Sequence, residues 1–290
     1  MFISRTRACA AKTMTMRLTR EVRCFYPDNL RRVRGSNNWS GTVGPEIGKY
    51  IALRATVEGD IDPETGYLCN IKRIEAVMRE SILPALDLSL ESRPANMGSM
   101  LQQAMTANAT SIGDGISLVA LDLSLSPLLT IAVSTETPDM MQLTQSFEFS
   151  AAHRLYREHL SDEQNRRLFG KCANANGHGH NYVVDVTVTD AVACDGGTDR
   201  NSDGGNSDDG KDAAIIGIPE LDRIVNERII ERFDHKHLNL DCPEFAELNP
   251  TVENIALVIY DLLDGRLSPA RLHQVRVWET PKTFAEYSGR

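Results

Sequence analysis

The chain has 290 residues, a formal net charge of −9 and 41% hydrophobic residues. This length indicates two domains or one large domain, and the apolar fraction suffices for a buried core, which excludes a chain that is disordered throughout. The acidic balance argues against a nucleic-acid-binding protein, which would present a basic surface. No apolar run reaches the 18 residues of a membrane-spanning helix.

The amino terminus and the cysteines together predict a cytoplasmic protein. The first twenty residues hold five basic side chains but lack the apolar centre of a secretory signal. We interpret residues 1–15 as a disordered leader, with a start at Met14 or Met16 and a short transit peptide as alternatives. The cysteines form no C-x-x-C pair and are too sparse for a disulfide scaffold, which favours a reducing compartment. They are Cys9, Cys24, Cys69, Cys172, Cys194 and Cys242.

The two halves of the chain share one order of predicted elements, which indicates a tandem duplication. The matched segments are the strands beginning at Tyr50 and Tyr182, the helices 71–83 and 219–233, and the Glu-Thr-Pro sequences 136–138 and 279–281. We therefore expect two α+β units, residues 16–139 and 140–290, each with a four-stranded antiparallel sheet and two helices on one face. Two unrelated α+β domains are the alternative.

Residue periodicity supports these elements in the second half. Residues 183–189 are rich in β-branched side chains and largely alternate, as in a half-buried strand. Apolar residues recur at helical spacing over 219–233, and Pro219 lies near the first turn, where its missing N–H costs nothing. Thr251 is placed to cap a helix over Val252–Leu263, and Gly265 is placed to end it.

The segment 191–213 is predicted to be a disordered insertion. It is rich in Asp, Gly, Asn and Ser and lacks enough apolar residues to form a core. The stretch from Asp190 to Asp212 holds seven Asp against Arg200 and Lys211, which is −5 and more than half of the chain's net charge of −9. A calcium loop is the alternative, but the aspartate spacing does not match the D-x-[DN]-x-[DN]-G pattern.

All seven histidines lie in the second half, which restricts metal chemistry to that half. His178 and His180 are two residues apart at the start of a predicted strand, so both rings point to one side. His153, at the end of the preceding strand, is the third candidate ligand. Three neutral imidazoles suit zinc and leave a fourth position open. A surface histidine pair is the alternative interpretation.

Four further residues are candidates for catalysis or binding. Cys172 lies six residues before His178, and a nearby cation would favour its reactive thiolate. Asp234 precedes His235 at the end of a predicted helix, where a carboxylate can orient the imidazole for acid–base work. Glu279 could accept two N–H bonds from a planar heterocycle. The alternatives are a buried hydrophobic cysteine, a histidine stabilised by the helix dipole and an exposed strand glutamate.

These motifs, taken in order, resemble those of the 6-pyruvoyl-tetrahydropterin synthase family, which also includes the bacterial 6-carboxytetrahydropterin synthases. The resemblance covers residues 141–290. Five stretches carry it: Phe149–Tyr156, Phe169–Tyr182, Phe233–Asn239, Pro250–Asn254 and Trp278–Thr280. It implies tunnelling-fold (T-fold) units, a zinc-dependent lyase and an oligomer with sites near unit interfaces.

The resemblance also implies a role for each candidate residue. His153, His178 and His180 would hold zinc, and Cys172 would abstract a proton as the thiolate. Asp234 and His235 would act as its relay partners. Glu279 would anchor the pterin, and Thr251 and Glu253 belong to a motif near the pterin pocket. The family substrate is 7,8-dihydroneopterin triphosphate.

The resemblance leaves two products open. The six-residue step from Cys172 to His178 resembles animal-type enzymes, which form 6-pyruvoyl-tetrahydropterin and release triphosphate. Many 6-carboxytetrahydropterin synthases, which serve queuosine synthesis and also release acetaldehyde, have a shorter step. We favour the 6-pyruvoyl product.

The first half departs from the pattern. Asn37, Asn38 and Trp39 stand in place of the His-x-His sequence, although Glu136 matches the pterin-anchoring glutamate. We therefore expect a degenerate first unit without a metal site. For the second unit, the alternatives to catalysis are non-catalytic pterin binding and a structural zinc domain.

Overall fold

The computed structural model describes residues 15–26, 49–86, 94–191 and 216–289. They fall into two compact units: unit 1 comprises residues 1–92, 99–123 and 132–138, and unit 2 comprises residues 93–98, 124–131 and 139–290. The leader up to residue 14, the Asn37–Trp39 segment and all of the predicted insertion except Ala191 lie outside the described residues. No helix in the described ranges is long and apolar enough to cross a membrane.

Unit 1 begins with a long hairpin-like pair, in which β1 (Thr15–Tyr26) runs antiparallel to β2 (Lys49–Asp60). The elements that follow in the first half of the chain are α1 (Ile71–Val77), a π-helical turn (Met78–Ile82), α2 (Leu83–Ala85), α3 (Pro94–Ala107), β3 (Ile116–Ser126) and β4 (Leu129–Ser134), and parts of α3, β3 and β4 belong to unit 2. The predicted helix 71–83 is confirmed and extends to Ala85. It starts at Asn70, whose side chain caps the Lys72 N–H, and its buried face packs Ile74, Met78 and Ile82 into the core.

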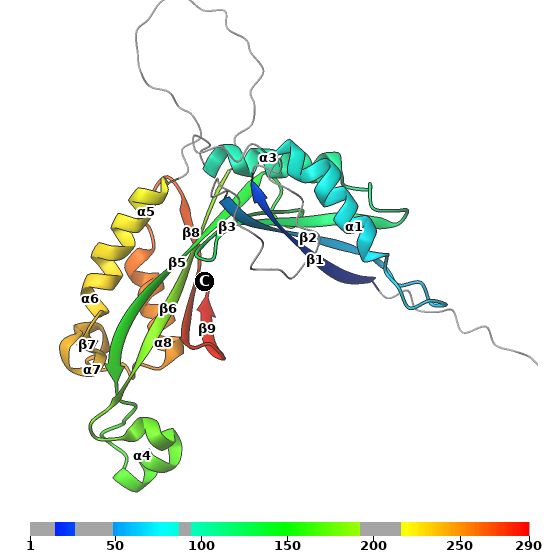
Figure 1. The fold of residues 1–290 in the computed structure, drawn as a ribbon. Coiled ribbons are helices and arrows are strands. Elements are labelled where there is room, and N and C mark those ends of the chain that lie inside the picture. The colour runs from blue at the N-terminus through cyan, green and yellow to red at the C-terminus, as the bar shows by residue number, and fades with distance from the viewer. Residues whose placement is uncertain (1–14, 27–48, 87–93, 192–215, 290) are drawn as a thin grey trace, which may run out of the picture. The chain divides into compact units, whose positions relative to one another are not determined.

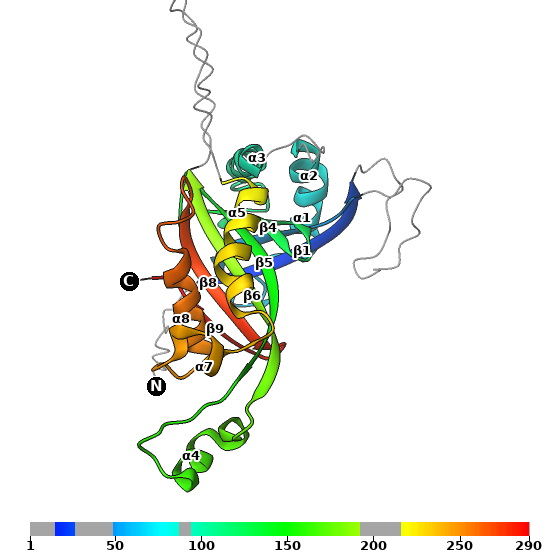
Figure 2. The ribbon, with the colours of Figure 1, turned by 90° about the vertical axis from the view of Figure 1, so that its left-hand side faces the viewer.

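Most strands of unit 2 form one antiparallel run of the sheet, labelled β5, β6, β8 and β9 in Figures 1 and 2. Its strands are β5 (Met140–His153), β6 (His178–Ala191), β8 (Arg271–Thr280) and β9 (Thr283–Tyr287), paired in that order, and the two-residue β7 (Lys236–His237), which pairs parallel to β5. Even-numbered residues of β6 and odd-numbered residues of β5 and β8 point to the same face. That face is buried and includes Tyr182, Phe149 and Val277.

Helices cover this buried face of the unit 2 sheet (Figure 2). They are α5 (Ile218–Val225), a π-helical turn (Asn226–Ile230), α6 (Glu231–Phe233), the short α7 (Leu238–Asp241) and α8 (Val252–Leu263). The helix predicted over 252–263 is confirmed: the Thr251 hydroxyl accepts the Asn254 N–H, and Gly265 adopts a φ of 68° after the last turn. The α+β class with an antiparallel sheet and helices on one face is also confirmed for unit 2.

The connection between β5 and β6 forms a separate small lobe beyond the ends of both strands (Figures 1 and 2). It contains α4 (Asp162–Phe169) and a 3₁₀ turn (Gly170–Ala173). A capping box between Ser161 and Gln164 starts α4, and the buried Asn165 side chain donates to three backbone carbonyls, which fixes the helix to the preceding loop. This lobe carries Cys172 to the point where β6 begins.

Candidate metal and active site

The register of β5 and β6 brings the three predicted ligands together. His153 is paired with His178 at the last rung of the ladder, and His180 follows two residues later on the same face. The Nε2 atoms of His153 and His178 are 3.2 Å apart, and one ring nitrogen from each of the three histidines lies within 4.8 Å of the others. The structure thus forms, from neighbouring strands, the cluster that the sequence predicted.

The orientation of His153 is fixed by the loop before α8. Its Nδ1 lies 2.6 Å from the carbonyl oxygen of Pro250 and donates to it, so Nε2 keeps its lone pair toward the other imidazoles. The His153 side chain has no exposed surface. Burial lowers the pKa of His153 to about 4, with a smaller contribution from the neighbouring histidines. The ring is therefore neutral at physiological pH, which is the ligand form of imidazole.

The polar atoms of the cluster fit a bound metal ion. The Nε2 atom of His180 is buried and has no hydrogen-bond partner. Burial also lowers the pKa of His180. Buried nitrogens without partners are costly unless a ligand satisfies them, and three neutral imidazoles are a donor set of borderline-soft divalent ions.

Glu279 lies against this cluster rather than at an exposed strand position. The pairing of Val183 with Trp278 sets β8 so that Glu279 comes next to the imidazoles. Its Oε1 is 3.5 Å from the Nε2 atoms of both His153 and His180, and its side chain is 21% exposed. The sequence therefore predicted a residue of the site, and its pterin-anchoring role stays a prediction.

Cys172 is half-buried in the 3₁₀ turn, where its carbonyl accepts the Leu155 N–H at 2.9 Å. Burial raises the pKa of the Cys172 thiol, and the Glu279 carboxylate raises it further. The chain's own groups therefore favour the protonated thiol. A cation at the imidazole cluster would act in the opposite direction, as expected from the sequence.

Asp234 and His235 form a pair beside β5. Oδ2 of Asp234 is 2.8 Å from Nδ1 of His235, and Oδ1 accepts the Ser150 N–H at 2.8 Å. His235 has a φ of 56°, and its N–H donates to the Ser150 carbonyl. The pKa of Asp234 is lowered, first by the Ser150 N–H and then by His235, so the carboxylate stays ionised.

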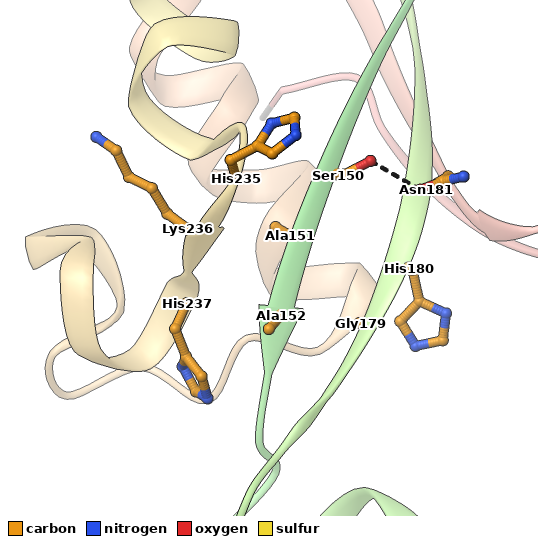
Figure 3. A pocket seen from close by; sticks show the side chains of 9 residues that line it. All are labelled: Ser150, Ala151, Ala152, Gly179, His180, Asn181, His235, Lys236 and His237. Carbon is orange, nitrogen blue, oxygen red and sulfur yellow. Dashed lines mark hydrogen bonds between the residues drawn. The ribbon is translucent and has the colours of Figure 1, made fainter.

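This Asp–His pair borders a hollow of about 570 Å³, in which His235, Lys236 and His237 line one wall (Figure 3). The His235 side chain is 83% exposed. Among the described residues, no hydrogen bond joins Asp234 or His235 to Cys172. The structure therefore brings His153, His178, His180 and Glu279 together, whereas the proposed relay pair is not in hydrogen-bond contact with the thiol.

The remaining predicted residues lie at the start of α8. The Thr251 hydroxyl is used as the helix cap, and Glu253 is exposed in the first turn. Their place near a pterin pocket stays a prediction.

Two contributions to the site were not predicted from the sequence. One is the Pro250 carbonyl, which follows from no side-chain pattern. The other is Tyr182, whose buried hydroxyl has no partner and whose pKa is raised by burial. The alternation His178, His180, Tyr182 could have indicated that this ring shares the face of the cluster.

Known proteins match the second half of the chain. A sequence model of the family described as 6-pyruvoyl tetrahydropterin synthase matches residues 142–290. The chain is similar to a human 6-pyruvoyl tetrahydrobiopterin synthase, with 38% identity over 51% of this chain and 91% of the relative. It is also similar to a Drosophila melanogaster protein of the same name, with 37% identity over 51% of this chain and 79% of the relative.

Two further comparisons are more distant or structural. A 6-carboxy-5,6,7,8-tetrahydropterin synthase of Aquifex aeolicus is 26% identical over 50% of this chain and 96% of the relative. A solved structure of Caenorhabditis elegans 6-pyruvoyl tetrahydropterin synthase matches 52% of this chain and 96% of its own, with 31% identity and a TM-score of 0.43. The family match spans half of the chain and contains all three histidines together with Cys172 and Glu279. The chain therefore belongs to the 6-pyruvoyl tetrahydropterin synthase family.

Proposed function

We propose that unit 2 converts 7,8-dihydroneopterin triphosphate to 6-pyruvoyl-tetrahydropterin with elimination of triphosphate. The observation that carries this proposal is the imidazole cluster of His153, His178 and His180, with the Glu279 carboxylate 3.5 Å from two of its nitrogens. The 38% identity to the human enzyme supports the 6-pyruvoyl product.

The three imidazoles would hold zinc, since three neutral nitrogen ligands leave an open position for substrate oxygens. A bound zinc ion supplies Lewis-acid chemistry, which acidifies the C–H beside a coordinated hydroxyl. Pro250 keeps His153 in the tautomer that this role needs. Glu279 would fix the pterin by accepting hydrogen bonds from a ring N–H and the amino group, with Thr251 and Glu253 nearby.

Proton transfer would be divided between Cys172 and the Asp234–His235 pair. The Cys172 thiolate would remove the proton from the acidified carbon. His235 would return a proton elsewhere on the substrate, because Asp234 holds its Nδ1–H and stabilises the imidazolium form. The pterin ring gains the hydrogens that the side chain loses, so the reaction needs no external redox cofactor.

The test is incubation of the purified chain with 7,8-dihydroneopterin triphosphate and zinc, followed by mass spectrometry of the product. We expect 6-pyruvoyl-tetrahydropterin, free triphosphate and no acetaldehyde. Acetaldehyde together with 6-carboxytetrahydropterin would assign the queuosine-type reaction instead. Binding without turnover would indicate a non-catalytic pterin-binding protein. A Cys172→Ala variant that keeps zinc and full turnover would refute the role of the thiolate.

We also propose that the chain is a tandem duplication with a degenerate unit 1 that supplies walls and sheet edges to an oligomer. Both units run strand, strand, helices, strand, strand, which supports a common origin. Residues 135–290 expressed alone should then lose activity or change their assembly state, as measured by turnover and light scattering. Unchanged values would contradict the proposal. The low density of cysteines supports a cytoplasmic location.

A further inference from the structure

A second cavity in unit 2 adjoins the imidazole cluster and is unusually basic for this acidic chain. It has a volume of about 710 Å³, and His178 is one of the residues that line it. Arg154 at the end of β5, Arg166 on α4 and Lys171 in the 3₁₀ turn contribute three cations to its wall. A volume of this size is in the usual range for a site that binds a small molecule.

These cations are not neutralised by acidic neighbours. Among the described residues, none of the three forms an ion pair. The acidic residue in the cavity wall is Asp162, which accepts a hydrogen bond from the Tyr156 hydroxyl at 2.9 Å. Three positive charges around one cavity repel each other, so the arrangement favours an anionic ligand.

Arg154 is held in place before any ligand binds. Its backbone N–H donates to Oδ1 of Asn239 at 2.8 Å, and its carbonyl accepts the Asn239 amide at 3.0 Å. Its Nε donates to the Ala173 carbonyl at 3.3 Å, and its guanidinium lies 3.8 Å from the centre of the Tyr156 ring. The other N–H groups of the guanidinium remain for a ligand, and the fixed position reduces the entropy lost on binding.

We propose that this cavity binds the triphosphate chain of the substrate while the pterin end occupies the site at Glu279. The inference rests on the proposed function, because it takes the substrate from there. His178 belongs to both the imidazole cluster and the cavity wall, so a substrate could extend from one to the other. Guanidinium and ammonium groups bind phosphate oxygens through charge-assisted hydrogen bonds.

The test measures the binding of inorganic triphosphate to the full chain by calorimetry, without turnover. Arg154→Gln and Arg166→Gln should each weaken triphosphate binding by about tenfold, as expected for the loss of a charge-assisted hydrogen bond. Binding of 7,8-dihydroneopterin, which lacks phosphate, should stay unchanged in both variants. Arg223→Gln is the matched control, because Arg223 is exposed on α5, pairs with Glu220 and Glu227, and does not line the cavity.

Three outcomes would overturn the inference. The first is unchanged triphosphate binding in the Arg154→Gln/Arg166→Gln double variant, and the second is orthophosphate binding as tight as that of triphosphate. The third is an equal loss of triphosphate and dihydroneopterin binding, which would indicate that the arginines have a structural role. If triphosphate binding depends on Arg154 and Arg166 but the chain does not turn over the substrate, the proposed function would be refuted and the triphosphate site in the cavity would be supported. If the chain turns over the substrate but the variants change neither triphosphate binding nor KM, the proposed function would be supported and the triphosphate site would be refuted.

Discussion

The turn at Gly177 offers the sharpest test of how the metal site is held. Gly177 has a φ of 66°, and a Cβ atom there would lie 2.7 Å from the His153 carbonyl oxygen and 2.8 Å from Nε2 of His237. Both distances are shorter than carbon contacts tolerate. Replacement by alanine must therefore strain the backbone and push the turn away from two histidines, one of which is a proposed ligand.

Gly265 provides a matched control for the backbone contribution. It has nearly the same φ, 68°, but no atom lies within 4 Å of the position that a Cβ atom would take there. The left-handed conformation alone should cost Gly265→Ala about 1 kcal/mol of unfolding free energy. Gly177→Ala should cost about 3 kcal/mol, because overpacking against a backbone carbonyl adds about 2 kcal/mol.

Urea unfolding of the two variants and the parent chain measures this difference, and a zinc titration of the folded variants measures its effect on the site. We expect Gly177→Ala to weaken zinc binding by about tenfold, as changes next to metal ligands do, because the displaced turn carries His178. Zinc affinity should be unchanged in Gly265→Ala. Equal destabilisation of the two variants, with equal zinc affinity, would refute this account of Gly177.

Three other predictions follow from the contacts of single residues. Chelator treatment should lower the melting temperature and added zinc should restore it by mass action, whereas His178→Ala should remove this response in differential scanning fluorimetry. Asp234→Asn should reduce kcat by about 10²-fold or more with little change in unfolding free energy, because the amide still accepts the Ser150 N–H but no longer stabilises an imidazolium. The pKa of Glu75 is lowered, chiefly by its hydrogen bond from Arg20. The ionised Glu75 therefore stabilises the fold fully above the ordinary carboxyl pKa, and this contribution to the unfolding free energy is lost as pH falls through the pKa of the folded state. Glu75→Gln should therefore lower unfolding free energy by about 1 kcal/mol at pH 7, and the difference should vanish in acid.

The helices and strands of unit 2 were predictable because their signals are local. The Thr251 cap, the apolar spacing over 252–263 and the β-branched run 183–189 each act within a few residues, and the structure has a helix or strand at each place. The histidine cluster was predictable for a related reason: an i, i+2 pair at the start of a strand and a histidine at the end of its neighbour meet when the strands pair in register.

The contacts that tune the site were not predictable in the same way. Pro250 and His153 are 97 positions apart, and the hydrogen bond that joins them uses a backbone carbonyl that any residue could provide. The cavity wall of Arg154, Arg166 and Lys171 depends on where the α4 lobe lies relative to the end of β5. The raised pKa of the Cys172 thiol depends on burial, which no spacing in the sequence reports.

The two glutamates that begin the matched Glu-Thr-Pro sequences show why similar sequence need not give a similar site. Glu279 is 21% exposed and lies against two imidazoles, so its carboxylate belongs to a cluster of buried ring nitrogens. Glu136 is 64% exposed, and its Oε1 accepts a hydrogen bond from Arg17, which also binds Glu58. An exposed carboxylate already paired with an arginine is well solvated and gains little from a pterin N–H. The same motif therefore places one glutamate in an ion pair with Arg17 of β1 and the other beside the imidazoles of His153 and His180.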